Sequence, residues 1–330
     1  MQDSKQNQQI SQISIGIDAG NFKLKAAFLN NKKIQVIESD NFLELREECE
    51  IFFDDFVTSC VIALPENYSK RYNDEIAFKA KTSGFENVNL ITSIDAVILS
   101  VNSEGCVLVL DVGKTHSEAL VINHNKLQEK INFEINGDFF NRIFSEWLSA
   151  RLLIEIIDEN FLIESENLKI SLSKSDFTEF RGVKIKRDDF ERLIRFHVRK
   201  IMHTLKRLES QYNPEKIIFT GNSCKIPLIL NTASIMLKKS PEYIENLIAK
   251  GTAIKNNSLF KNESVKNDAN SEIRNKIRNL RHDLISIEEI LTRSQKDRLY
   301  NLFTNAESGN YEIINILENL MLELKTLRSE

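Results

Sequence analysis

Two stretches, ISIGIDAGNFKLKAAFL at residues 13–29 and VLVLDVGKTHSEALVI at residues 107–122, decide the fold. Each leads an apolar run to an aspartate, breaks at a glycine-containing turn and resumes as a second apolar run. A strand, a tight turn and a second strand predict a β-hairpin. Because the same pattern occurs twice, the sequence indicates an internally duplicated α/β fold.

The segments around the hairpins read as alternating helices and strands. Apolar spacing predicts helices over residues 42–56, 73–83, 93–102, 138–157, 162–173, 187–210 and 241–250, the last ending at Gly251. It predicts further strands over residues 59–64, 88–92 and 214–220. Pro227 stands where proline opens a helix, in its first turn.

Both ends of the chain differ from this pattern. Residues 1–12 are polar and read as a disordered tail, and residues 257–271 are rich in Asn, Ser, Lys and Asp, which is typical of a linker. Residues 272–330 carry Leu and Ile stripes at helical spacing, which predict a small bundle of two or three helices. We interpret these stripes as a core rather than a membrane or cofactor face.

Composition excludes several classes of protein. The 330 residues have a net charge of −4, so no basic field indicates a nucleic-acid partner. Only 10 Gly and 4 Pro are present, which argues against disordered and loop-rich all-β chains. The four cysteines have neither metal nor disulfide spacing, no apolar run could span a membrane, and the N-terminus lacks a signal peptide's apolar core. We therefore expect a reduced, cytoplasmic protein.

The two glycine turns also suggest chemistry. An aspartate that ends a strand before a glycine turn can direct its carboxylate at a metal-bound nucleotide, while the turn's N–H groups approach phosphate oxygens. One such turn is common, but Asp18 and Asp111 stand at equivalent places in the two hairpins. A third glycine turn, at Gly221, lies between a predicted strand and a helix, where N–H groups suit a phosphate or ribose.

These segments resemble the heat shock protein 70 (DnaK-type) family of the actin-like ATPase superfamily, over roughly residues 13–260. The two hairpins look like the family's phosphate loops, and IIFTGNSCKIPLI (217–229) looks like its adenosine loop. Three further matches occur in the family's order: VIALPENYSKRYNDEIAFKAKTSGFENVNLI (61–91), INGDFFNRIF (135–144), and ENLKISLS (166–173) followed by KIKRDDFERL (184–193).

The resemblance implies an actin-like ATPase fold, with two RNase H-like βββαβα lobes around a nucleotide cleft. This domain would span residues 13–256, with an outer subdomain reduced to a remnant at about 39–58. ATP or ADP with Mg²⁺ would be its cofactors. Asp18 and Asp111 would be the catalytic residues and would orient Mg²⁺ through bound water. The remaining implied nucleotide contacts are Gly20, Asn21, Lys23, Gly113, Lys114, Thr115, Glu166, Lys169, Ser173, Gly221, Asn222 and Lys225.

Departures from the family pattern predict weak or absent hydrolysis. Asn21 and Phe22 replace the threonines expected after the first glycine, and Lys114, Thr115 and His116 replace further loop residues. Ser93 replaces a glutamate that helps set up the attacking water. Lys23 and Lys114 are candidates to restore lost positive charge. His116 could accept a proton, but an ordinary hairpin position is the favoured interpretation.

The function that follows is a nucleotide-dependent, chaperone-related protein-interaction switch. Its protein partner would bind the helical tail or the outer lobe surface. The family's β-sandwich substrate domain is not recognisable, and residues 294–320 resemble its helical lid only loosely. Two alternatives remain, an actin-like filament-forming ATPase and a pseudo-enzyme scaffold without hydrolysis.

Overall fold

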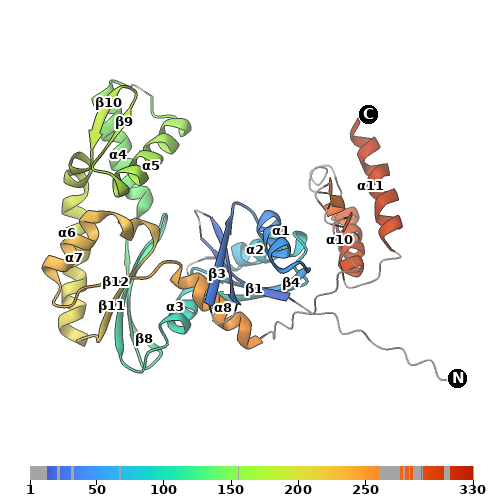
Figure 1. The fold of residues 1–330 in the computed structure, drawn as a ribbon, viewed down its shortest axis with the longest axis horizontal. Coiled ribbons are helices and arrows are strands. Elements are labelled where there is room, and N and C mark those ends of the chain that lie inside the picture. Colours follow the sequence, from blue (N-terminus) through green and yellow to red (C-terminus); the bar gives the residue numbers. More distant parts are fainter. Residues whose placement is uncertain are drawn as a thin grey trace. The chain divides into compact units, whose positions relative to one another are not determined.

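The computed structural model is a mixed α/β protein that divides into two compact units (Figure 1). Unit 1 combines residues 1–100 with residues 248–330, and unit 2 comprises residues 101–247. The structure describes residues 13–20, 23–30, 33–66, 68–154, 156–259, 276–277, 279–281, 283–284, 291, 293–307 and 313–329. The predicted tail at 1–12 and most of the predicted linker lie outside these residues. Among the described helices, none is long and apolar enough to cross a membrane.

Unit 1 contains a five-stranded mixed sheet in the order β3-β2-β1-β4-β5. Its strands are β1 (Ile13–Ala19), β2 (Leu24–Asn30), β3 (Lys33–Ser39), β4 (Val57–Leu64) and β5 (Asn87–Thr92). The β1–β2–β3 meander is antiparallel, whereas β4 and β5 run parallel to β1. All eight residues of β4 are buried, as expected of a central strand with apolar residues on both faces.

Helices of unit 1 come from both ends of the chain. They are α1 (Phe42–Phe53), α2 (Lys70–Thr82), α3 (Ser93–Val101), α8 (Leu247–Leu259), α10 (Arg293–Glu307) and α11 (Ile314–Ser329). Asn41 caps α1 and Ser69 caps α2, each accepting a hydrogen bond from a first-turn N–H. Phe303 of α10 and Leu317 and Met321 of α11 are among the apolar residues buried in one cluster with Phe56.

Helix α8 corrects the sequence-based assignment of residues 241–250. Residues Glu242–Tyr243 form a short strand, β12, and the helix begins only at Leu247 and continues through Gly251 to Leu259. Gly251 does not end the helix. Glycine is needed there because α3 packs closely against it: a Cβ on Gly251 would lie 1.8 Å from the carbonyl oxygen of Ala96. Gly16 of β1 also lies close to α8, since a Cβ on Gly16 would lie 2.3 Å from the Thr252 carbonyl carbon.

Unit 2 contains a second five-stranded sheet, in the order β12-β11-β6-β7-β8. Its remaining strands are β6 (Cys106–Val112), β7 (Ser117–Asn123), β8 (Lys126–Phe133) and β11 (Lys216–Thr220). The β6–β7–β8 meander is antiparallel, and β11 and β12 run parallel to β6. The strand order and directions therefore repeat those of unit 1, which is compatible with an actin-like ATPase fold.

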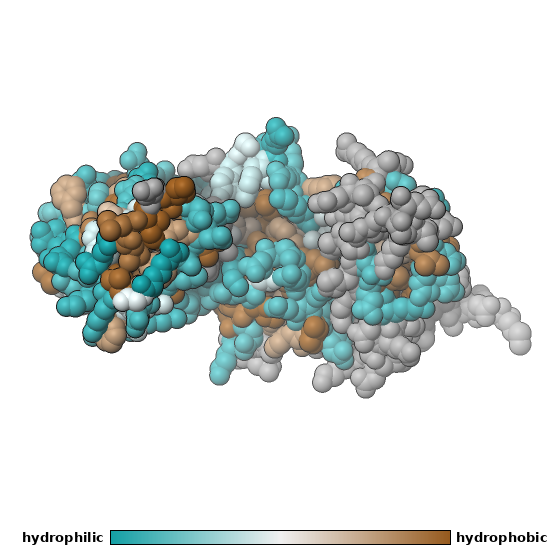
Figure 2. Space-filling model, turned by 90° about the horizontal axis from the view of Figure 1, so that it is seen from above, coloured by the Kyte–Doolittle hydropathy of each residue, from teal (hydrophilic) through white to brown (hydrophobic). Residues whose placement is uncertain are grey.

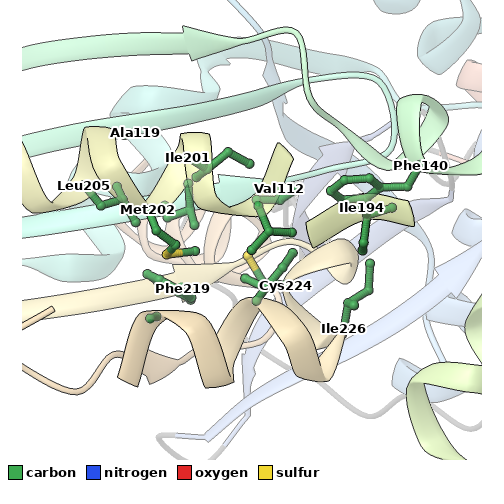
Figure 3. Packing of buried hydrophobic residues seen from close by; sticks show 14 of the residues in the cluster. Val112, Ala119, Phe140, Ile194, Ile201, Met202, Leu205, Phe219, Cys224 and Ile226 are labelled. Atoms are coloured by element: carbon green, nitrogen blue, oxygen red, sulfur yellow. The ribbon is translucent and has the colours of Figure 1, made fainter. Parts of the chain in front are cut away.

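The helices of unit 2 enclose its core. They are α4 (Gly137–Leu152), α5 (Glu159–Lys174), α6 (Arg187–Tyr212), the 3₁₀ helix η1 (Asn222–Lys225) and α7 (Pro227–Met236). The long helix α6 lies along the sheet, and its Ile194, Ile201 and Met202 pack with Phe219 and Cys224 (Figure 3). Cys224 is thus a core residue, and burial raises the pKa of its thiol.

Two features of unit 2 differ from the sequence-based prediction. The helix expected over 138–157 ends at Leu152, because Leu153 adopts a left-handed conformation with φ 54°. An unpredicted hairpin, β9 (Phe177–Phe180) and β10 (Val183–Lys186), follows α5. Figure 2 shows apolar side chains gathered on part of the surface of unit 2, and Leu153 and Ile156 are among its most exposed apolar residues.

Candidate functional site

The first hairpin places Asp18 at the end of β1, in a row of alternating charges. Lys25 of β2 lies opposite Asp18, and Glu38 of β3 lies opposite Lys25. Lys25 Nζ is 3.4 Å from Glu38 Oε1. Burial raises the pKa of Asp18 to about 6, with Lys25 opposing and Glu38 adding to the rise. The strand pairing therefore holds the Asp18 carboxylate in an environment that disfavours its charged form.

Gly20, which follows β1, is exposed. Among the residues that the structure describes, the atoms nearest to a Cβ built on Gly20 are Asp18 Oδ1 and the Lys23 carbonyl oxygen, each at 3.7 Å. Lys23, which follows the turn, lies 3.8 Å from Asp40 between Nζ and Oδ1. Asn21 and Phe22, both singled out from the sequence, lie outside the described residues.

The second hairpin places Asp111 near the end of β6, between Thr220 of β11 and Glu118 of β7. Gly221 follows Thr220 with φ 82°, in the region that favours glycine. A Cβ on Gly221 would lie 2.3 Å from Asp111 Oδ1 and 2.5 Å from the Val112 carbonyl oxygen. Only glycine therefore lets the turn after β11 lie against the Asp111 carboxylate.

Backbone hydrogen bonds fix the turn after Asp111 to the start of α4. The N–H of Gly137 donates to the Gly113 carbonyl at 2.9 Å, and the N–H of Asp138 donates to the Lys114 carbonyl at 2.8 Å. Asn136 Nδ2 donates to the Thr115 carbonyl at 2.8 Å. Helix N-termini commonly bind anions through such N–H groups. Here the first two of them already have protein partners.

Side-chain charges gather at the same place. Lys114 Nζ lies 3.0 Å from Glu166 Oε2 of α5, and Lys169, one turn further along α5, donates to the Gly137 carbonyl at 3.4 Å. Lys169 is buried, which lowers its pKa to about 8 although Glu166 and Asp138 oppose this. Burial would raise the pKa of Glu166, but Lys114 and Lys169 hold it below its ordinary value. We call Lys114, Glu166 and Lys169 the lysine–glutamate cluster.

A second group of charges joins His116, which the sequence singled out, to Glu118 and Lys130, which it did not. Glu118 is buried and lies 3.0 Å from His116 Nε2 and 3.3 Å from Lys130 Nζ. The hydrogen bond to Glu118 raises the pKa of His116. His116 thus has a charged partner in the hairpin. The sequence signal that could have identified Glu118 is its position in the predicted hairpin, where the pairing of β6 and β7 puts it opposite Asp111.

The other predicted residues of unit 2 are held less directly. Ser173 donates its hydroxyl to the Lys169 carbonyl at 3.1 Å, Asn222 is exposed on η1, and Lys225 pairs with Glu245. Ser223, which was not predicted, donates to the Gly113 carbonyl at 3.4 Å and links η1 to the turn after Asp111. Among the residues the structure describes, no three His, Cys, Asp or Glu side chains converge where they could hold a metal ion.

Comparison with known proteins gives one consistent result. No family model matches the chain. It is 26% identical over 240 residues to a chaperone protein HscA homolog of Rickettsia felis, covering 67% of this chain and 37% of that protein. The homologs of Rickettsia prowazekii and Rickettsia africae are 26% and 27% identical, each over 64% of this chain and 38% of their own.

The chain therefore spans less than two fifths of the length of the curated relatives it matches. HscA proteins are chaperones of the heat shock protein 70 type. The similarity extends over about two thirds of this chain, in agreement with the motifs read from its sequence. The chain is thus a relative of the heat shock protein 70 family that matches it in part.

Proposed function

We propose that this protein binds an adenine nucleotide with Mg²⁺ and uses it as a switch for protein interaction, with weak or no hydrolysis. The lysine–glutamate cluster beside the turn after Asp111 is the observation that carries the proposal. It combines one cation suited to phosphate, Lys114, with a carboxylate suited to ribose hydroxyls, Glu166, and the buried Lys169 beside it. The repeated strand order of the two sheets supports an actin-like ATPase fold for residues 13–256.

The roles of the residues follow the family resemblance. Mg²⁺ at a nucleotide is usually held by one or two carboxylates, with phosphate oxygens and waters completing its shell. Asp111 and Asp18 fit this chemistry, and both end a strand at a glycine turn. The nucleotide, when bound, supplies the remaining oxygen ligands. Gly20, Asn21, Lys23, Gly113, Lys114 and Thr115 would face the phosphates, and Glu166, Lys169, Ser173, Gly221, Asn222 and Lys225 the nucleoside.

Weak hydrolysis follows from what the site lacks by sequence. Phosphoryl transfer depends on a positioned water and on stabilisation of charge in the transition state. Ser93, buried at the start of α3, cannot act as the family's glutamate would. Losing one electrostatic stabiliser costs on the order of 100- to 1000-fold in rate. An ATP turnover near one per second that Asp18→Ala abolishes would contradict this proposal.

Ligand-induced stabilisation tests the binding itself. A ligand that binds only the folded state adds about 2.7 kcal/mol at a hundredfold excess over its Kd. We expect millimolar ATP with Mg²⁺ to raise the Tm of the full chain, and Glu166→Ala to reduce this shift. Lys126→Gln, at the other end of the β7–β8 hairpin, is the matched control and should keep it. An unchanged Tm in ATP would refute nucleotide binding.

We further propose that a protein partner binds the outer surface of unit 2 or the C-terminal helices. Leu153 is 90% exposed and Ile156 76%, which is unusual for large apolar side chains close in sequence. Affinity capture from the native host should recover a partner that Leu153→Ser with Ile156→Ser loses. Ile235→Ser, an equally exposed residue of α7, is the control. ATP-dependent cooperative pelleting would instead favour the filament-forming alternative.

A further inference from the structure

In the turn after Asp111 the backbone is held by hydrogen bonds, whereas the charged side chain of Lys114 can change its partner. Four protein donors hold the carbonyls of residues 113–115, from Gly137, Asp138, Asn136 and Ser223. Gly113 also donates its N–H to the His116 carbonyl at 2.9 Å. These bonds restrain the backbone of the turn. A phosphate at the turn would need a cationic side chain to balance its negative charge.

Lys114 is the lysine of this turn, and its present partner can be exchanged. Its side chain is 31% exposed and that of Glu166 is 17% exposed, so water partly screens their ion pair. Ion pairs that are partly exposed to water contribute little to stability. A phosphate group offers a lysine more charge and more acceptor oxygens than one carboxylate does. The flexible four-carbon stem of lysine allows the exchange without movement of the backbone.

Glu166 does not lose its counter-charge when Lys114 leaves, because Lys169 remains beside it. Lys169 is only 6% exposed and is held by the Gly137 carbonyl, so it stays in place. Its pKa, lowered by burial, is lowered further by the positive charge of Lys114. Moving Lys114 towards a phosphate therefore favours the charged form of Lys169, which then neutralises Glu166.

We propose that Lys114 makes the site select phosphorylated nucleotides over nucleosides, by exchanging Glu166 for the ligand's phosphate. This inference rests on the proposed nucleotide site. When a nucleoside binds, Lys114 stays paired with Glu166 and competes with the ribose hydroxyls for this carboxylate. When a nucleotide binds, Lys114 pairs with the phosphate instead, and Glu166 can accept hydrogen bonds from the ribose hydroxyls. One side chain thus couples phosphate recognition to ribose recognition.

The test is a titration of the full chain with adenosine, AMP, ADP and ATP at constant Mg²⁺, followed by calorimetry. For Lys114→Gln we expect the affinity for ATP to fall about tenfold or more, since it loses a charged hydrogen bond. The affinity for adenosine should rise about two- to fivefold, because Glu166 loses a competitor. Lys114→Arg should keep the preference for phosphorylated ligands, and the control Lys126→Gln should bind like the unmodified protein.

A double-mutant cycle tests whether Lys114 affects adenosine binding through Glu166. In a Glu166→Gln background, Lys114→Gln should no longer raise the affinity for adenosine. It should still lower the affinity for ATP. An equal loss for adenosine and ATP in Lys114→Gln, or no loss of ATP affinity, would overturn the inference while the nucleotide site stands. If the unmodified, folded protein bound none of the four ligands, the proposed function and this inference would both be refuted.

Discussion

The turns that follow Asp18 and Asp111 occupy equivalent positions in the two sheets, but their described residues differ in their contacts. Both join antiparallel strands in sheets of one strand order. Gly20 of the first turn is exposed, and the nearest described atoms lie 3.7 Å from a Cβ built on it. The second has its carbonyls bonded to α4 and its lysine paired with Glu166. Both hairpins have the same strands, whereas the surroundings of their glycines differ: a Cβ on Gly113 would lie 2.8 Å from the His116 carbonyl oxygen, and one on Gly20 would lie 3.7 Å from the nearest described atoms.

This difference indicates how a bound ligand would be recognised by each turn. An exposed turn can change its partners without breaking existing contacts, so sequence changes there affect ligand contacts more than stability. A turn whose carbonyls accept hydrogen bonds from its own unit has a more restrained backbone. The following predictions use matched substitutions to separate these two behaviours.

The largest expected difference is between the glycines. Gly221→Ala should lower the free energy of unfolding by at least about 3 kcal/mol, because its Cβ would overlap Asp111 and the Val112 carbonyl at a φ of 82°. Gly20→Ala should change it by no more than about 0.5 kcal/mol. Urea unfolding of both variants measures the contrast. Equal destabilisation by the two would show that Gly221, which lies against Asp111 in the turn after β11, is packed no more tightly than Gly20.

A smaller effect concerns the charge of Asp18. Its pKa is raised from 3.8 to about 6, so the folded state binds more protons between these values and stability falls as pH rises through them. The cost is fully present above pH 6 and absent below about pH 4. Asp18→Asn should therefore add on the order of 2 to 3 kcal/mol at pH 7.5, while weakening the stabilisation by ATP and Mg²⁺.

Chemical unfolding of Asp18→Asn at pH 7.5 and pH 4 measures this gain and its disappearance. Asp40→Asn, an exposed carboxylate of the same unit, is the control and should stay within about 0.5 kcal/mol of the unmodified protein. Destabilisation by Asp18→Asn at pH 7.5 would mean that Lys25 outweighs the effect of burial.

The smallest effect belongs to His116. The Glu118 hydrogen bond raises the pKa of His116, so its contribution is fully present below its unfolded pKa near 6.5 and is lost as pH rises through the raised value. His116→Gln should remove this part of the pH dependence, a change of about 1 kcal/mol or less. Thermal unfolding of both proteins between pH 5.5 and pH 8.5 checks it. A stability difference that grows with pH would contradict the assignment.

Much of the fold could be predicted because its signals are local. Alternation towards Asp18 and Asp111, the glycine turns and Pro227 each depend on neighbouring residues, and the structure has the corresponding strands and helix. The hairpin of β9 and β10 was missed although Arg181 and Gly182, both at positive φ, form its two-residue turn. Strands of four residues give too short a pattern to compete with the helices around them.

What could not be predicted depends on contacts between distant segments. Gly251 looks like a helix end in sequence, and only the nearness of Ala96 explains why it continues a helix. The pairing of Lys114 with Glu166 joins residues 52 positions apart. The bonds from α4 to the turn after Asp111 are likewise tertiary. The sequence identified Lys114, Glu166 and Lys169, but their mutual contacts required the structure.

Helix α8 has a consequence for how the chain is made. It completes unit 1 by packing on Gly16 and by setting Ala249 and Ala253 against Ala27, yet it is translated only after all of unit 2. At roughly 5–20 residues per second, a ribosome needs on the order of ten seconds or more to synthesise the intervening residues. During that interval the nascent first sheet lacks the helix that packs against β1. Unit 2, being continuous, can fold first.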